Sequence, residues 1–272
     1  MIHGIKNDFL YTAKKVVATW NMDGECVTAQ GTGFFVGNGS DFLAFVTNRH
    51  VVEPGYDDPK YKGYELFGLA IDSYIAIDET GKPIEYNNRA IANAKIGFDV
   101  NPNNDVACLT NIFAHGGIEV ALPISLDDLA TEEWINSKLT VCDTIAYPGF
   151  PAWFDHKKNT PIFRMGTIAS DPRNDYCCRE DEPEAARIAY EGFSSSGASG
   201  SPVFAAQKGF PVGRTIQAPP DFYREVKVIG INAGHFSDKE KNHSGISYFY
   251  KSSVIRNILD RMMKESTPSS KK

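Results

Sequence analysis

Clusters of basic residues and long apolar runs are both missing from this 272-residue chain. Its 28 Lys and Arg residues are scattered, and 34 Asp and Glu residues outnumber them, which gives a formal net charge of -6. Because binding to nucleic acid normally requires clustered positive charge, we expect no nucleic-acid partner. No apolar run approaches the ~20 residues that span a bilayer, so we expect no membrane partner either.

Cysteine is sparse, and its spacing excludes two common uses. An odd number of thiols with one adjacent pair does not form a disulfide framework, and no Cys-x-x-Cys spacing indicates zinc: the five are Cys26, Cys108, Cys142, Cys177 and Cys178. The N-terminal segment carries charges and lacks the apolar core and small-residue cleavage site of a signal peptide. We therefore predict a cytoplasmic protein with reduced thiols and with neither metal nor other cofactor.

Short apolar runs separated by turn signals make up most of the chain. Many short strands at this spacing predict an all-β fold of barrels or sandwiches, with strands at 15–20, 26–30, 31–37, 42–47, 64–71, 106–110, 139–147, 160–170, 201–204 and 226–234. Two segments have helical patterns: 125–137, which Ser125 would cap, and 251–265, which carries an amphipathic stripe. Long connections at 53–64, 171–187 and 205–225 are where we expect specificity and regulation.

Five serines lie in the segment 191–204, EGFSSSGASGSPVF. Such a run is typical of a flexible loop, and it also fits a turn that presents one serine as a nucleophile. Ser199 alone has a glycine two positions before it and another directly after it, Gly197 and Gly200. Glycines allow the tight turn that aims backbone N–H groups at a developing oxyanion, so Gly197 and Ser199 are the candidate donors.

A serine nucleophile also needs a base and a third group that orients the base. His50 follows an apolar run in FVTNRHVVE, and Asp105 directly precedes one in NPNNDVACLT. Alone, each fits an ordinary structural role, that of a packed histidine or an acid in an Asx turn. Together with Ser199 they follow the chain order His, Asp, Ser, which differs from the orders of α/β-hydrolases and subtilisins.

Seven motifs in order carry a resemblance to a known family. They are GTGFFVG, VTNRHVVE, NNDVACL, AYPGFP with RMGTIAS, SGASGSPVF, VIGINAG and GISYFY, and a C-terminal helix follows them. The sequence resembles trypsin-like serine peptidases of the chymotrypsin fold, on the side of the bacterial glutamyl-endopeptidases and the high-temperature-requirement proteases. The resemblance implies two six-stranded antiparallel β-barrels, with one barrel in 1–124, a second in 125–250, a helix in 251–264 and a disordered tail in 265–272.

The same resemblance implies roles for individual residues. Ser199 would be the nucleophile, His50 the general base and Asp105 the group that orients it, with Gly197 and Ser199 as the oxyanion hole. Substrate would pair with the INAG strand and contact a pocket formed by Phe193, Ser194, Ser196, Asn232, Ala233 and Gly234. Ala198 replaces the aspartate by which zymogen-type relatives capture a new N-terminus. Asn232 replaces the histidine of glutamyl-specific relatives, so the resemblance favours a neutral residue before the scissile bond.

Three functions remain open at this point. The first is an intracellular serine endopeptidase that cleaves polypeptides through an acyl-enzyme, gated by a regulatory protein or ligand because an unregulated cytosolic protease is hazardous. The second is a protease-fold binding module that is inactive or activated by a partner. The third is an esterase, since acyl transfer to water serves both kinds of substrate.

Overall fold

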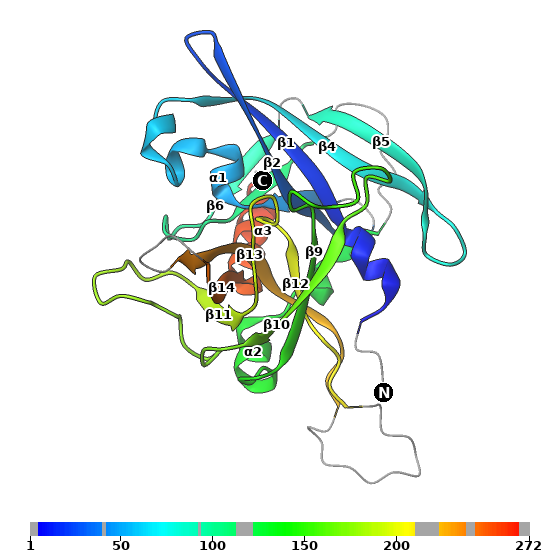
Figure 1. Cartoon of the computed structure of the whole chain (residues 1–272), viewed down its shortest axis with the longest axis vertical. Coiled ribbons are helices and arrows are strands. Elements are labelled where there is room, and N and C mark those ends of the chain that lie inside the picture. The colour runs from blue at the N-terminus through cyan, green and yellow to red at the C-terminus, as the bar shows by residue number, and fades with distance from the viewer. Residues whose placement is uncertain are drawn as a thin grey trace, which may run out of the picture.

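A computed structural model describes residues 5–39, 42–91, 94–112, 122–209, 223–237 and 243–266. Strands dominate these residues, and the predicted all-β class is confirmed. Figure 1 shows two β regions, with the N-terminal strands in the upper part of the view, the C-terminal strands in the lower part and helix α3 between them.

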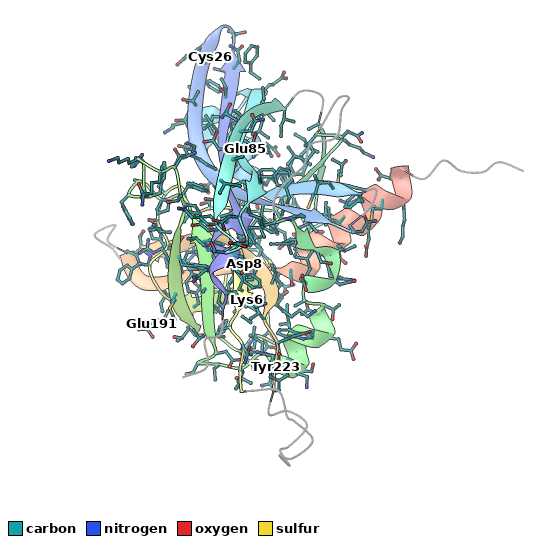
Figure 2. The ribbon with its side chains drawn as sticks, turned by 90° about the vertical axis from the view of Figure 1, so that its right-hand side faces the viewer. Lys6, Asp8, Cys26, Glu85, Glu191 and Tyr223 are labelled. Atoms are coloured by element: carbon teal, nitrogen blue, oxygen red, sulfur yellow. The ribbon has the colours of Figure 1, made fainter. Side chains whose placement is uncertain are left out.

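The N-terminal region is one sheet with the strand order β5-β4-β1-β2-β3-β7-β6, and β8 pairs with β2 in parallel. Its strands are β1 (Ala13–Met22), β2 (Glu25–Gly37), β3 (Leu43–Thr47), β4 (Glu65–Ile77), β5 (Pro83–Ile91), β6 (Lys95–Phe98), β7 (Ala107–Thr110) and β8 (Ile124–Ser125). Asp23 and Gly24 both have positive φ between β1 and β2, as a two-residue hairpin turn requires. Figure 2 shows Cys26 beside this turn at one end of the molecule.

The C-terminal region is a closed barrel with the order β10-β11-β14-β13-β12-β9. Its strands are β9 (Thr144–Gly149), β10 (Ile162–Ile168), β11 (Arg187–Glu191), β12 (Pro202–Ala205), β13 (Lys227–Ser237) and β14 (His243–Lys251). Here the predicted six strands are present. The N-terminal region has more strands than the predicted six-stranded barrel, because the β4–β5 hairpin extends the sheet at one edge. This sheet does not close, because its edge strands β5 and β6 do not pair within the described ranges.

Helices are few and short, apart from the last. They are α1 (Arg49–Val52), α2 (Glu132–Lys138) and α3 (Ser252–Ser266), with 3₁₀ turns η1 (Asn7–Thr12), η2 (Pro54–Tyr56), η3 (Pro59–Tyr61) and η4 (Leu126–Asp128). The amphipathic prediction corresponds to α3. The sequence predicts a disordered tail from residue 265, but Glu265 and Ser266 still belong to this helix, and residues 267–272 lie outside the described residues. The predicted helix at 125–137 is split, because Ser125 caps only η4 while Thr131 accepts a hydrogen bond from the Trp134 N–H and begins α2. None of the helices described here combines the length and apolarity of a membrane span.

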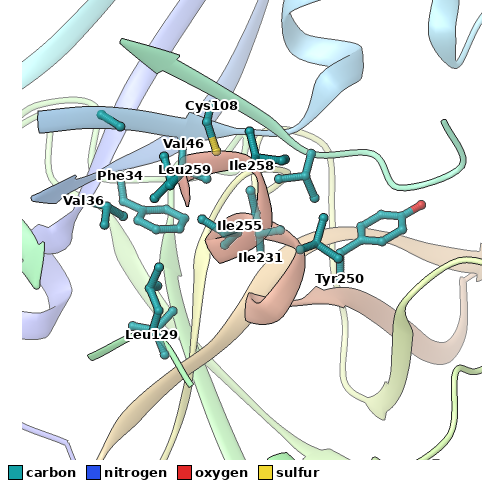
Figure 3. Close-up of a cluster of buried hydrophobic side chains, with 14 of the residues drawn as sticks. Phe34, Val36, Val46, Cys108, Leu129, Ile231, Tyr250, Ile255, Ile258 and Leu259 are labelled. Carbon is teal, nitrogen blue, oxygen red and sulfur yellow. The ribbon is translucent and has the colours of Figure 1, made fainter. Parts of the chain in front are cut away.

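A shared core joins the two regions. Each region has its own apolar cluster, and a third cluster lies where they meet. Figure 3 shows Ile255, Ile258 and Leu259 of α3 in one cluster with Phe34 of β2 and Ile231 of β13. Burial of these side chains against both regions stabilises their relative position, which is what a site assembled from both of them requires.

Candidate active site

His50 lies where β3 has ended and the short helix α1 begins. The buried side chains of Val51 and Val52 hold this turn against the N-terminal core, which fixes the backbone that carries the imidazole. The His50 side chain keeps 24% of its surface exposed. The histidine is therefore positioned by packing on its C-terminal side and is still open to a reactant.

Asp105 lies just before β7 and contacts His50 twice. Its Oδ2 atom is 2.7 Å from the imidazole Nδ1, and its Oδ1 accepts a hydrogen bond of 2.9 Å from the His50 backbone N–H. The Asn48 side chain donates to the Asp105 carbonyl over 2.6 Å, which ties the two segments together. A carboxylate on Nδ1 favours the tautomer in which Nδ1 carries the proton and Nε2 is free to accept one.

The pKa of His50 is raised above its usual value. Burial opposes the charged form, but the Asp105 charge and its hydrogen bond favour that form more strongly, and Asp57 adds a further attraction. The imidazole is thus a stronger base than a free histidine. A proton taken up at Nε2 would be stabilised by the carboxylate on the opposite side of the ring.

Ser199 lies in a turn that only glycine can form at two positions. Gly197 has φ +88°, and a Cβ there would lie 2.4 Å from the Phe150 carbonyl oxygen. Gly200 has φ +91°, and a Cβ there would lie 1.8 Å from the Thr32 carbonyl oxygen. The spacing that singled out Ser199 in the sequence therefore has a steric basis.

The N-terminal sheet holds this turn through Thr32, a residue that the sequence analysis did not select. The Thr32 N–H donates to the Ser199 carbonyl over 2.9 Å, and its hydroxyl donates to the Gly197 carbonyl over 2.6 Å. The same hydroxyl accepts from the Phe150 N–H at 3.0 Å. A threonine between two glycines in GTGFF was the available signal, but its partners are more than a hundred residues away in sequence.

The backbone N–H groups of Gly197 and Ser199 donate no hydrogen bond to any other described residue. Gly197 and Ser199 line a hollow of about 390 Å³ that His50 also lines. Two such donors in one turn are what a developing oxyanion needs. In this structure the Ser199 hydroxyl donates to the Ala233 carbonyl over 2.9 Å, so this hydrogen bond must break before the hydroxyl proton can pass to His50.

The predicted pocket residues divide into two groups. Ser196 and Phe193 are exposed beside the turn, and Ala233 and Gly234 lie on β13. Asn232 and Ser194 are buried, and Asn232 donates to the Ser194 hydroxyl over 2.9 Å and to the Ala198 carbonyl over 3.0 Å. Their polar groups are occupied in supporting the turn, and the Tyr190 hydroxyl completes this network with a 2.7 Å bond to Asn232.

Two further histidines lie along this wall. The rings of His235 and His243 are stacked at 4.3 Å, and Phe193 lies 4.7 Å from His243. Burial and the neighbouring His235 lower the pKa of His243, so its imidazole is neutral at pH 7. Among the described residues, no three His, Cys, Asp or Glu side chains gather as metal ligands would.

Comparisons with known proteins show a family and similar folds. The family model of the trypsin-like peptidase domain matches residues 31–213. The structure is similar to the protease Anisep from Arthrobacter nicotinovorans, with a TM-score of 0.53, 13% identity, and coverage of 92% of this chain and 94% of that chain. It is also similar to the active form of the Rv3671c protease from M. tuberculosis, with a TM-score of 0.47, 13% identity, and coverage of 92% of this chain and 81% of that chain. No curated protein matches the sequence significantly.

Proposed function

The chain belongs to the trypsin-like peptidase domain family, and we propose that it is a serine endopeptidase with His50, Asp105 and Ser199 as its catalytic triad. The observation that carries this proposal is the 2.7 Å contact between Asp105 and His50 Nδ1, with the imidazole and Ser199 lining one hollow. The likeness to the glutamyl-endopeptidase and high-temperature-requirement branch rests on sequence motifs alone, and we retain it as part of the proposal.

The proposed reaction has two halves. Ser199 Oγ attacks the peptide carbonyl while its proton passes to His50 Nε2, and the N–H groups of Gly197 and Ser199 stabilise the oxyanion. The C–N bond then breaks, and the His50 proton goes to the leaving amine. In the second half His50 removes a proton from water, whose oxygen attacks the acyl-enzyme, and the proton returns to Ser199. Asp105 stabilises the imidazolium in both halves.

Substrate binding would use β13 and the turn before Ser199. We propose that the substrate backbone adds to β13 at Ala233 and Gly234, and that the side chain before the scissile bond lies against Phe193 and Ser196. The wall carries His243, whose pKa is lowered by burial and by the neighbouring His235, and a buried Asn232, which supports a neutral residue at that position.

A gate by a ligand or partner remains part of the proposal. The contact of the Ser199 hydroxyl with the Ala233 carbonyl supports it, because that contact must be released before attack. It equally supports the second candidate, a protease-fold binding module that is inactive until a partner acts. The five free cysteines, four of them exposed, support an intracellular, reducing setting.

A fluorophosphonate probe tests the proposal because it reacts only with an activated serine. We expect the isolated protein to be labelled at Ser199, the Ser199→Ala and His50→Ala variants to remain unlabelled, and a peptide library to be cleaved. Labelling only after a partner or ligand is added would favour the gated module. Hydrolysis of esters without any peptide cleavage would favour an esterase. Peptide cleavage that survives Ser199→Ala would show the assignment to be wrong.

A further inference from the structure

The hollow beside Ser199 extends along the N-terminal sheet rather than along β13. Its walls come from three parts of the chain: Trp20, Ala29, Gln30 and Gly31 of the β1–β2 hairpin; His50 and Val51 of α1 with Pro54, Asp57, Asp58 and Tyr61 of the connection that follows; and Ser196, Gly197 and Ser199 of the nucleophile turn. None of the residues that line it belongs to β13. If β13 pairs with the acyl side of the substrate, as proposed above, this hollow is left for the residues that follow the scissile bond.

Asp57 gives this hollow a negative charge that no described cation neutralises. Its carboxylate makes no hydrogen bond or ion pair with another described residue, it is exposed, and it is close enough to His50 to raise the pKa of that imidazole. The neighbouring Asp58 differs, because Lys60 Nζ lies 3.0 Å from its Oδ2 atom. Asp57 is therefore the carboxylate available to a cation brought in by a substrate.

Aromatic surfaces lie next to these acids. The rings of Trp20 and Tyr61 are 6.0 Å apart and both line the hollow. Lys60 already shows how an ammonium group binds here, since its Nζ lies 4.5 Å over the Tyr61 ring while it pairs with Asp58. Aromatic faces favour the alkyl stems and cationic heads of Lys and Arg.

From the hollow, its unpaired carboxylate and its aromatic walls we infer that the enzyme selects a Lys or Arg side chain at one of the two positions after the scissile bond. Asp57 is the specificity-determining residue, and Trp20 and Tyr61 contact the stem of the basic side chain. This inference rests on the proposed peptidase function and adds the leaving-group side of its substrate class. An acidic side chain there would face Asp57 without a partner.

The test uses one cleaved sequence from a peptide library, remade with Arg, Ala or Glu at each of the two positions after the scissile bond. We expect kcat/KM to follow the order Arg, Ala, Glu, with about fivefold between Arg and Ala, the size of a partly exposed ion pair. Asp57→Asn should bring Arg and Ala within about twofold, and Asp57→Lys should reverse the order so that Glu is preferred. The preference should weaken at high salt.

Asp260→Asn is the matched control, since it removes the same charge from an exposed position on α3. This variant should keep the wild-type ratio of kcat/KM between the Arg and Ala peptides. If Asp57→Asn also keeps the ratio, or if wild-type enzyme cleaves the Arg and Glu peptides equally, the inference is wrong even though fluorophosphonate labels Ser199. If wild-type protein is neither labelled nor able to cleave any peptide, the proposed function fails and the inference fails with it.

Discussion

The two β regions contribute to the site in different ways. The N-terminal sheet is open within the described residues, and it places His50 just after the end of β3 and Asp105 just before the start of β7. The C-terminal barrel is closed and holds Ser199 on a turn that is bonded to both regions. The chemistry therefore depends on a contact between the regions, and the shared core around α3 is what maintains it.

Buried charge also differs between the regions. In the barrel, Arg224 pairs with Asp143, and Lys251 Nζ lies 2.9 Å from Glu132 and 2.8 Å from Asp175. In the N-terminal sheet, Lys14 is fully buried, donates to the Tyr11 carbonyl, and has its pKa lowered by burial to about 7. The barrel pairs these cations with carboxylates, whereas burial at Lys14 favours a neutral lysine; Lys15, the next residue of the same strand, is instead paired with Asp72 at 2.6 Å.

The largest expected effect comes from removing the N-terminal contribution to the triad. Asp105→Asn keeps the shape of the side chain but removes the carboxylate that accepts the proton of His50 Nδ1. The imidazole then loses both its orientation and its partner charge. We expect kcat to fall by about three to four orders of magnitude. Steady-state cleavage of a fluorogenic peptide measures this fall, with thermal unfolding as the control for folding. A loss below tenfold would contradict the assigned role of Asp105.

Breaking a buried ion pair in the barrel should cost the most stability. Arg224→Met leaves Asp143 with only its partners Lys208 and the Thr140 N–H, and the Arg224 and Asp143 side chains are 4% and 5% exposed. We expect the free energy of unfolding to fall by about 3 kcal/mol, as measured by urea denaturation. Arg173→Met breaks an exposed pair with Asp171 and should cause no measurable loss. Equal effects of the two substitutions would contradict the difference between buried and exposed pairs.

Whether a feature of this protein could be predicted from the sequence depends on how far apart in the sequence the interacting residues lie. Ser199 could be found because the glycines that shape its turn are its own neighbours, and His50 because the apolar residues that anchor it are adjacent. The strands β5, β6, β8, β11 and β14 were not among the strands predicted from apolar runs. For example, β5 (PIEYNNRAI) lies at a sheet edge and is rich in polar residues, so it has little apolar alternation.

The rest of the site depends on contacts between distant segments. Thr32 acts on a turn that begins more than 160 residues later, and Asn232 supports that same turn from β13. Asp57 lies in a connection that the sequence analysis associated with specificity, but its position beside His50 depends on the fold of that connection. Residues of this kind carry no local pattern, because their role is set by the partner that folding brings to them.

The two buried lysines should give stability opposite dependences on pH. The lowered pKa of Lys14 means that the unfolded chain binds one more proton between pH 7 and 10.5, so Lys14 makes the free energy of unfolding rise through that window by about 1.4 kcal/mol per pH unit. The pKa of Lys251 is raised, so this residue contributes to the free energy of unfolding fully below pH 10.5, and that contribution is lost at higher pH. Urea denaturation at pH 7.5, 8.5 and 9.5 should show the rise disappearing in Lys14→Met and persisting in Lys251→Met. A rise of the same slope in both variants would contradict this account.

The smallest expected effect tests how Asp57 of the N-terminal region acts on His50. The base must be neutral to accept a proton, so the raised pKa of His50 places the acid limb of kcat/KM above pH 6.5. Asp57→Asn removes one of the charges that favour the imidazolium, so the limb should move to lower pH. A peptidyl ester with a small alcohol leaving group measures this shift, because it places no side chain in the hollow. Asp260→Asn should leave the pH of the acid limb unchanged. If the limb in Asp57→Asn stays at the wild-type pH or moves to higher pH, the Asp57 carboxylate does not act on the imidazole.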